Sequence, residues 1–386
     1  MQDPFSLNRI LNIDPSKVHK TYERWPIMAR SGFNIELDLP RAGFRKAYVL
    51  GMGGSAAGGE IIASWLSDRP EFEVATFKGR LPIGSMSDVL AIACSASGQT
   101  EETIEMMETA VQRSATTVSV SSGGKLMEVS KKLRVPHVMM PEVVAPRYML
   151  PFIIFSCLSI INEGLGLGCE DEAENALKEM EVEGQAVGIN TPASENPSKQ
   201  LALSILEKTP VIYGSMSTRG AGIRFKNLLN ENAKIHAIFD GLPDAFHNEV
   251  EAWEDPSVDF APVLLRHPSE TERDKEGADL MMRILSELRK NPIEIKGRGK
   301  SNLAQLLTMV YRLDVASYYA AIGIGRDPFP TRLMDRFKVK GHKRSQDTAP
   351  MHRIGSNQPN SSRDENSATE TDSLKSHKRT NFSSKT

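Results

Sequence analysis

The chain is poor in cysteine, in net charge and in long apolar runs, and each shortage narrows what it can do. Its 386 residues include only three cysteines, Cys94, Cys157 and Cys169, with no CxxC pair. The sequence therefore predicts neither a disulfide framework nor a zinc knuckle, and we expect a cytoplasmic protein. A formal net charge of −2 argues against nucleic acid or a membrane surface as the main partner.

Signatures of a leader, a membrane span and a metal site are missing as well. The first ten residues lack the continuous apolar core of a secretory signal. The most apolar stretch, residues 149–161, is interrupted by Pro151 and is shorter than the ~20 residues that cross a bilayer, so we expect a buried core helix. The eight histidines form no HxH or HExxH pair, and no GxSxG is present. We expect no metal, no cofactor and no membrane partner.

Two small polar loops, about forty residues apart, are the strongest positive signal in the sequence. Residues 51–55 (GMGGS) follow the apolar run 47–50, and residues 95–103 (SASGQTEET) follow the apolar run 89–93. Each pattern indicates a buried strand that ends in a tight turn and then opens a helix. Free backbone N–H groups, short hydroxyls and a helix N-terminus together bind phosphate. The pair predicts a site for a small phosphorylated ligand.

A dinucleotide site is a second hypothesis for the first loop. Residues 51–56 fit GxGxxA, and Lys78 and Arg80 follow the second strand, where they suit a 2′-phosphate. An NADP-dependent oxidoreductase is therefore an alternative. A pyrophosphate needs no second hydroxyl-rich loop, however. Tight turns without any ligand explain the glycines but not Ser95, Ser97 and Thr100 together.

Strand and helix signals alternate along the chain in two series. The first predicts strands near 47–50, 72–77, 89–93, 116–120 and 137–140, with helices near 55–66, 101–113 and 125–132. The second begins at 210–215 and continues through 235–238, 261–265 and 292–295, before a long helix near 301–322. Such alternation predicts an α/β fold in which helices cover both faces of a parallel sheet. Its repetition predicts a duplicated domain.

We divide the chain accordingly into five parts. They are an N-terminal helical arm (1–45), a first, phosphate-binding domain (46–165), a connecting helix and linker (166–200), a second domain with C-terminal helices (201–340) and a polar tail (341–386). The tail carries eight Lys and Arg and five Asp and Glu, with few apolar residues. We expect it to be disordered, because it cannot bury enough apolar surface to offset the entropy of ordering.

Candidate acid–base residues lie in the second half. Glu231 stands at the end of an amphipathic helix in an Asn-rich stretch, and His247 follows sixteen residues later. A carboxylate base and an imidazole acid suit proton transfer at carbon and the opening of a sugar ring. A lone Glu on a helix is usually a solvated charge and a lone His is usually structural, so their spacing leaves both interpretations open. An isomerase without a metal would need an enediol path, which suits a Glu base.

The motifs taken together resemble a known family. GMGGS followed by SASGQTEET is similar to the sugar isomerase domain, which phosphosugar isomerases share with regulators that bind phosphosugars. More narrowly, the chain resembles the bifunctional phosphoglucose/phosphomannose isomerases over roughly residues 20 to 340. Further matching segments are 145–148 (APRY), 230–234 (NENAK), 246–249 (FHNE), 327–331 (DPFPT) and 335–338 (DRFK). The resemblance implies two sugar-isomerase domains in tandem, each a flavodoxin-like, parallel-sheet αβα sandwich.

The resemblance also implies an activity and a role for each site residue. The enzyme would interconvert glucose 6-phosphate, and mannose 6-phosphate, with fructose 6-phosphate through a cis-enediol. Glu231 would carry the proton between C2 and C1, and Arg147 would shield the charge on the enediolate oxygens. His247 and Lys338 would assist ring opening, and Thr331 would leave room near C2 for both epimers. The residues around the 6-phosphate would be Gly53, Gly54, Ser55, Ser95, Ser97 and Thr100.

Two further expectations follow from the resemblance. The protein would be a homodimer in which His247 reaches the active site of the partner subunit. Gln99 and Ala96 depart from the family pattern, which has Asn and a larger residue there, but the phosphate-binding hydroxyls remain. A regulator of the same fold, which binds a phosphosugar without chemistry, is the alternative; it would not need Glu231, His247 and Lys338 together.

Overall fold

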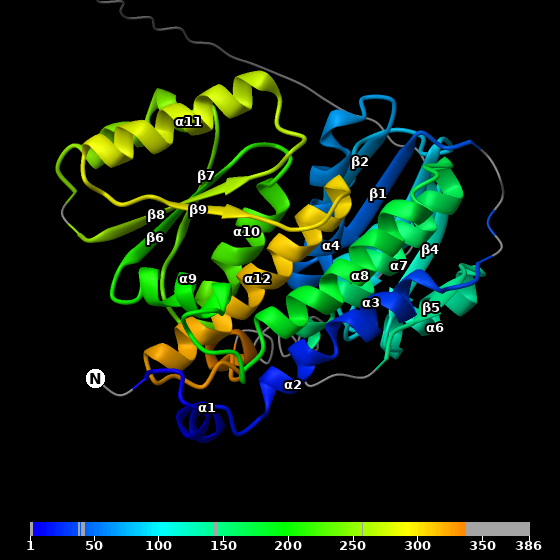
Figure 1. Cartoon of the computed structure of the whole chain (residues 1–386). Coiled ribbons are helices and arrows are strands. Elements are labelled where there is room, and N and C mark those ends of the chain that lie inside the picture. The colour runs from blue at the N-terminus through cyan, green and yellow to red at the C-terminus, as the bar shows by residue number, and fades with distance from the viewer. Residues whose placement is uncertain (1–2, 38, 40–42, 142–144, 257, 337–386) are drawn as a thin grey trace, which may run out of the picture. The chain divides into compact units, whose positions relative to one another are not determined.

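The first half of the chain folds around a five-stranded parallel sheet in the computed structural model (Figure 1). Its strands are β1 (Lys46–Gly51), β2 (Glu73–Phe77), β3 (Val89–Ser95), β4 (Thr116–Ser121) and β5 (His137–Met139), in the order β2-β1-β3-β4-β5. Helices α4 (Gly53–Trp65), α5 (Glu101–Gln112) and α6 (Gly124–Leu133) connect them. This order is the flavodoxin-like one. The predicted strands and helices of the first series are confirmed.

Helices cover both faces of this sheet because its strands are apolar on both sides. Along β1, Ala47 and Val49 pack into a core with α4 and α7 (Leu150–Leu165). Tyr48 and Leu50 point to the opposite face and pack with α5 and α6. Successive side chains of a strand alternate between faces, so one buried run supplies two cores. The predicted αβα sandwich is confirmed.

Helix α7 contains the most apolar stretch of the chain. The segment Pro146–Leu165 is long and apolar enough to cross a membrane, but 83% of its apolar window is buried within the protein. Helix α3 (Trp25–Phe33) packs along it so closely that a Cβ at Gly32 would lie 2.6 Å from the Phe152 carbonyl oxygen. The expected core helix is confirmed, and the N-terminal helices α1 (Leu7–Ile13), α2 (Val18–Glu23) and α3 precede β1.

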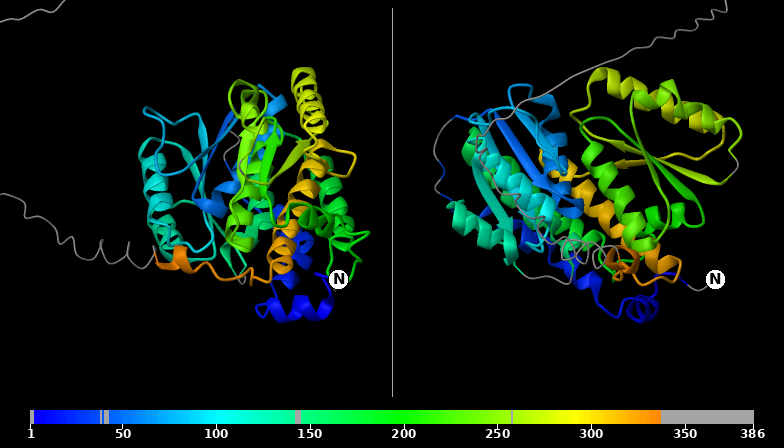
Figure 2. Two further views of the ribbon diagram at one scale, coloured as in Figure 1. Left: turned by 90° about the vertical axis from the view of Figure 1, so that its left-hand side faces the viewer. Right: turned by 180° about the vertical axis from the view of Figure 1, so that it is seen from behind.

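The second half contains a four-stranded parallel sheet, shown from two further sides in Figure 2. Its strands β6 (Thr209–Gly214), β7 (Ile238–Gly241), β8 (Phe260–Arg266) and β9 (Ile293–Lys296) have the order β7-β6-β8-β9. One face packs with α11 (Glu272–Glu287) and the other with α10 (Arg219–Leu228). Helices α8 (Glu170–Ala186) and α9 (Pro197–Ile205) precede this sheet and α12 (Asn302–Gly323) follows it.

One strand lies elsewhere than expected. The apolar residues 235–238 predict a strand, but β7 begins only at Ile238. Ile235 is instead held by the π-helical turn Leu229–Ala233 that follows α10: its N–H donates to the Leu229 carbonyl (3.2 Å), and its own carbonyl accepts from Asn230 Nδ2 (2.8 Å). These bonds satisfy the backbone of residue 235 outside the sheet, which moves the strand toward Gly241.

The structure describes residues 3–37, 39, 43–141, 145–256 and 258–336. The described residues up to Thr331 form one compact unit, and 332–336, which are helical, belong to a second. Lys338 and the expected disordered tail, 341–386, lie outside the described residues. The domain boundaries stay a prediction, and α9 runs through the expected boundary at residue 200.

Candidate active site

The two polar loops meet at the crevice of the first sheet. Strands β1 and β3 are neighbours in the sheet, although β2 comes between them in the sequence. Such a switch in strand order opens a crevice at the carboxyl ends of the two strands. Gly51 at the end of β1 is paired with Cys94, directly before Ser95. The Ala96 N–H donates to Ser55 Oγ at 3.1 Å, which joins the loops.

The hydroxyls of the second loop are held by bonds within it. Ser95 Oγ and Thr100 Oγ1 are 2.9 Å apart, and Ser97 Oγ accepts from the Gln99 N–H at 3.3 Å. Gly98, at φ +65°, makes this shape possible, because a Cβ there would lie 1.9 Å from the Gly123 carbonyl oxygen. The structure thus brings together the four residues expected at the phosphate, Ser55, Ser95, Ser97 and Thr100.

An arginine–carboxylate pair borders the first loop. Arg147 lies in a 3₁₀ turn, Pro146–Met149, before α7, and Glu231 lies in a π-helical turn, Leu229–Ala233, that continues α10. Arg147 Nε is 3.9 Å from Glu231 Oε2, and the side chains are 8% and 22% exposed, so solvent screens the pair little. A Cβ at Gly54 would lie 3.4 Å from Arg147 Cα, which places Arg147 beside the first polar loop.

The guanidinium of Arg147 is fixed from several sides. Its Nε donates to Asn232 Oδ1 at 3.1 Å, and its Nη2 donates to the carbonyl oxygens of Pro328 (2.9 Å) and Phe329 (2.6 Å). Within the described part of the chain, Nη1 has no hydrogen-bond partner. The two carbonyl bonds also bring the segment that ends at Thr331, which is half-buried, to the site.

Lys234 also bonds both the turn that contains Glu231 and the segment before Pro328. Its ammonium donates to the carbonyl oxygens of Glu231 (2.7 Å), Asn232 (3.1 Å) and Asp327 (3.2 Å). Loss of water around this group lowers the pKa of Lys234 to about 8, and the charge of Arg147 contributes to the decrease. Lys234 therefore links the turn of Glu231 to the loop of Asp327.

A buried ion pair, Arg224 with Asp314, contacts the backbone of Arg147. Arg224 Nε and Nη2 lie 3.2 and 2.8 Å from the two carboxylate oxygens of Asp314, and Nη2 also donates to the Arg147 carbonyl at 2.7 Å. Burial raises the pKa of Asp314 to about 6, although Arg224 opposes the shift. Sequence reasoning missed this pair; the signal for it is a lone Asp in the apolar run around residue 314.

Comparison with known proteins assigns the chain to a family. Residues 194–340 match the family model described as the bacterial phospho-glucose isomerase C-terminal SIS domain. A bifunctional phosphoglucose/phosphomannose isomerase of Aquifex aeolicus is 33% identical over 294 residues, which are 75% of this chain and 88% of the relative. The chain belongs to this family. The resemblance found in the sequence is confirmed.

Further comparisons agree with this membership. The family member of Caldicellulosiruptor bescii is 29% identical over 335 residues, covering 84% of this chain and 96% of the relative. The crystal structure of a glucose-6-phosphate isomerase like protein of Thermus thermophilus aligns with a TM-score of 0.59 and 18% identity. It covers 88% of this chain and 99% of that structure, and at this identity it shows the shared fold.

His247 is not bonded to the Arg147–Glu231 pair within the described part of this phosphoglucose/phosphomannose isomerase family member. It ends a 3₁₀ turn, Asp244–His247, after the edge strand β7, and its side chain is exposed. Among residues 3–336, with the gaps given above, no hydrogen bond or ion pair joins it to Glu231 or Arg147. No group of three or more His, Cys, Asp or Glu in that same part is placed to hold a metal.

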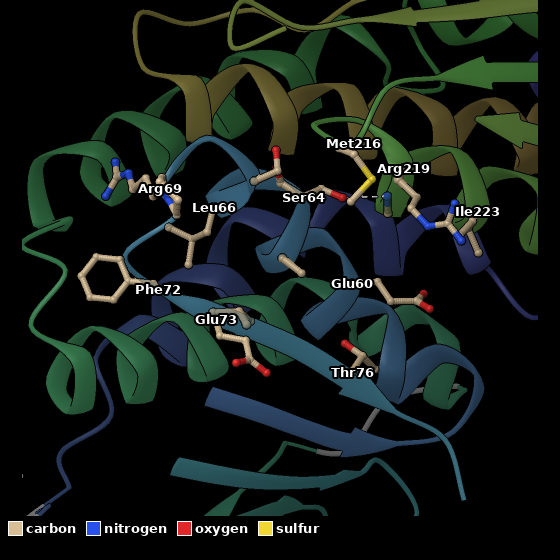
Figure 3. A pocket seen from close by; sticks show the side chains of 15 residues that line it. Glu60, Ser64, Leu66, Arg69, Phe72, Glu73, Thr76, Met216, Arg219 and Ile223 are labelled. Atoms are coloured by element: carbon tan, nitrogen blue, oxygen red, sulfur yellow. Dashed lines mark hydrogen bonds between the residues drawn. The ribbon is translucent and has the colours of Figure 1, made fainter. Parts of the chain in front are cut away.

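A separate cleft of about 430 Å³ lies between β2, α4 and the start of α10 (Figure 3). None of the expected site residues lines it. Its carboxylates already have partners: Glu60 accepts from Lys78 Nζ (2.5 Å) and Glu73 from the Tyr48 hydroxyl (2.8 Å). Ser64 Oγ accepts from the Gly220 N–H at 2.9 Å. Both carboxylates of this cleft therefore already have protein partners, whereas the hydroxyl of Thr76, which also lines it, is buried and has no hydrogen-bond partner in the described part of the chain.

Proposed function

We propose that this chain is a sugar-phosphate isomerase that interconverts glucose 6-phosphate, and mannose 6-phosphate, with fructose 6-phosphate. One observation carries the proposal. The hydroxyl-rich loops after β1 and β3 border the pair of buried Arg147 and half-buried Glu231 through Gly54. A phosphate at the loops leaves the other end of a short sugar beside Arg147 and Glu231. The names of its relatives support the same reaction class.

The phosphate end of the substrate would be held by the loops. Ser55, Ser95, Ser97 and Thr100 provide hydroxyls, and Gly53 and Gly54 allow the backbone to approach the anion closely. The hydroxyls of Ser95 and Thr100 already hold each other at 2.9 Å, so little ordering remains to be done when the phosphate binds.

The chemistry would take place at C1 and C2. Glu231 removes the C2 proton of the open-chain aldose and returns it to C1, through a cis-enediol. Arg147 Nη1 then donates to the oxygens on which negative charge develops, while its other donors stay bound to Asn232 and to the 328–329 carbonyls. Because these donors are placed before the reaction, stabilising the charge costs no reorganisation.

The remaining roles complete the proposal. His247, from the partner subunit of a homodimer, and Lys338 would move protons during ring opening and closing. Thr331 would leave room at C2 for either epimer. We also propose a cytoplasmic setting, where the free and buried Cys94, Cys157 and Cys169 stay reduced.

Turnover of both aldose phosphates by the purified chain, with a chelator present, tests the function. We expect fructose 6-phosphate from each, and Glu231→Gln to lower kcat by about 10²- to 10⁴-fold while substrate still binds, because the amide cannot take the proton. Glu287→Gln, an exposed change on α11, is the matched control and keeps wild-type kcat.

Other outcomes discriminate among the alternatives. Activity on glucose 6-phosphate alone keeps the mechanism and rejects the role of Thr331. Phosphosugar binding without turnover indicates the regulator. Tight binding of NADP, measured by titration, would indicate the oxidoreductase. Parallel loss of binding and kcat in Glu231→Gln would contradict its assignment as the base.

A further inference from the structure

Next to Glu231 in the same π-helical turn lies a fully buried amide. The side chain of Asn232 is 0% exposed, whereas Glu231 is 22% exposed. The turn therefore directs two consecutive residues to different surroundings: the carboxylate to the site, and the amide into the protein. π-Helical turns are rare and often occur at functional sites.

All four hydrogen-bonding positions of this amide are used. Asn232 Oδ1 accepts from Arg147 Nε (3.1 Å) and from the Tyr148 hydroxyl (3.2 Å). Nδ2 donates to the Ser317 hydroxyl (2.9 Å) and to the Tyr22 hydroxyl (3.4 Å). These partners come from α2, the turn before α7, and α12. One side chain thus ties three distant segments to the turn that carries Glu231.

The orientation of the amide is fixed by the chemistry of its partners. Arg147 Nε–H can only donate, so the atom that faces it must be the oxygen. A flipped amide would set two donors against each other at 3.1 Å. Ser317 in turn donates to the Asp314 carbonyl at 2.6 Å, which leaves its oxygen free to accept from Nδ2. The network is consistent in one orientation only.

We infer that Asn232 is a positioning residue, which holds the Arg147 guanidinium at a fixed place relative to the Glu231 carboxylate. This inference rests on the proposed function of that pair. With Nε held by Asn232 and Nη2 held by the 328–329 carbonyls, Nη1 is the nitrogen left to donate to the developing charge. Without the Asn232 oxygen, Nε loses its partner and can turn toward Glu231 Oε2, which lies 3.9 Å away, while Nη2 alone keeps its bonds to the carbonyls.

Asn232→Ala in the full chain is the first test. We expect kcat for glucose 6-phosphate to fall about 100-fold, as for a displacement of about 1 Å in a catalytic group, with KM changed less than about threefold. The matched control is Asn196→Ala. Asn196 is also 0% exposed and bonds the Lys199 N–H and the Gly188 carbonyl, each at 3.0 Å, far along the chain from the site. It should lose stability but keep kcat per folded molecule.

Asn232→Asp gives a second test, the pH dependence of kcat, which would not change if Asn232 had only a structural role. It also replaces the alanine variant if that variant does not fold. The carboxylate keeps the acceptor for Arg147 but neutralises its charge. We expect the acidic limb of the pH–kcat profile to shift to higher pH, because the added carboxylate shares the charge of Arg147 and the site then holds further negative charge less well. The inference is overturned if Asn232→Ala keeps kcat within twofold and the profile of Asn232→Asp superposes on that of the wild type.

A binding measurement separates this inference from the proposed function. The probe is 5-phosphoarabinonate, whose carboxylate resembles the charged oxygens of an enediolate. We expect it to bind Asn232→Ala at least tenfold more weakly than the wild type. If the wild type isomerises neither sugar, the proposed function fails, and this tenfold difference still supports the positioning role. Equal binding to wild type and variant contradicts it.

Discussion

At the scale of single residues, the hydroxyls of the loop that we propose for the phosphate are held by each other. Thr100 precedes α5 and its hydroxyl is paired with Ser95 at 2.9 Å. Both groups can turn toward an anion without moving the backbone. A hydrogen bond to a charged group contributes about 1.5–3 kcal/mol, which corresponds to a tenfold or larger change in affinity.

Thr100→Val therefore tests this loop with almost no change of shape. We expect KM for glucose 6-phosphate to rise about tenfold or more, by the same arithmetic, while kcat falls less, because the reacting carbons lie at the other end of the sugar. Steady-state kinetics measures both. Thr109→Val on the same helix is the control, since its hydroxyl donates to the Glu105 carbonyl at 2.7 Å. An unchanged KM would remove Thr100 from the phosphate site.

Residue by residue, the site divides into what local pattern can predict and what it cannot. Ser95, Ser97 and Thr100 follow a buried strand, and strand ends meet at one edge of a parallel sheet, so their grouping was predictable. Asn232 was not. Its partners at positions 22, 148 and 317 are brought together only by packing, and no spacing in the sequence shows that an Asn beside a Glu is buried.

At the scale of elements, α10 and α12 are joined by a charge pair that water does not reach. The side chains of Arg224 and Asp314 are 3% and 0% exposed, and Arg224 also holds the Arg147 carbonyl. Removing one member of such a pair leaves the other charge buried and unpaired, which costs about 3–5 kcal/mol. The pair thus couples the packing of two helices to the position of a site residue.

Asp314→Asn should lower the free energy of unfolding by about 3–5 kcal/mol. The amide keeps the shape but leaves the charge of Arg224 without a counterion. Urea unfolding followed by circular dichroism gives the value. Asp279→Asn is the matched change in a partner that is 61% exposed, 2.7 Å from Arg266, and it should cost less than about 1 kcal/mol. Equal losses of stability in the two variants would show that the buried pair stabilises the fold no more than the exposed pair does.

The positions of strands and helices were predictable where the apolar residues of a segment repeat with the period of that element. Strands β1 and β3 and helices α5 and α12 lie close to the expected ranges, because their apolar periods match the faces that they bury. The start of β7 is shifted because the π-helical turn after α10 bonds the backbone groups of Ile235. The π-helical turn that separates Glu231 from Asn232 likewise has no local signature in the residues 229–233.

At the scale of the whole molecule, the position of His247 bears on the proposed dimer. The side chain is exposed at the end of a 3₁₀ turn and, in the described part of the chain, is not bonded to Glu231 or Arg147. An acid that assists ring opening must come within hydrogen-bond reach of the substrate. If His247 serves the site of a second copy, each active site is composed of two chains, and an isolated chain should be nearly inactive.

Mixing two inactive variants distinguishes the arrangements. In a heterodimer of Glu231→Gln with His247→Ala, a shared site leaves one of the two sites with both groups intact and puts both changes in the other. Random exchange makes about half of the dimers mixed, so activity should return to about a quarter of wild type. The mixture is unfolded, refolded and assayed, with each variant refolded alone as the control. If His247 acts within its own chain, every site in every dimer lacks one group, and no activity returns.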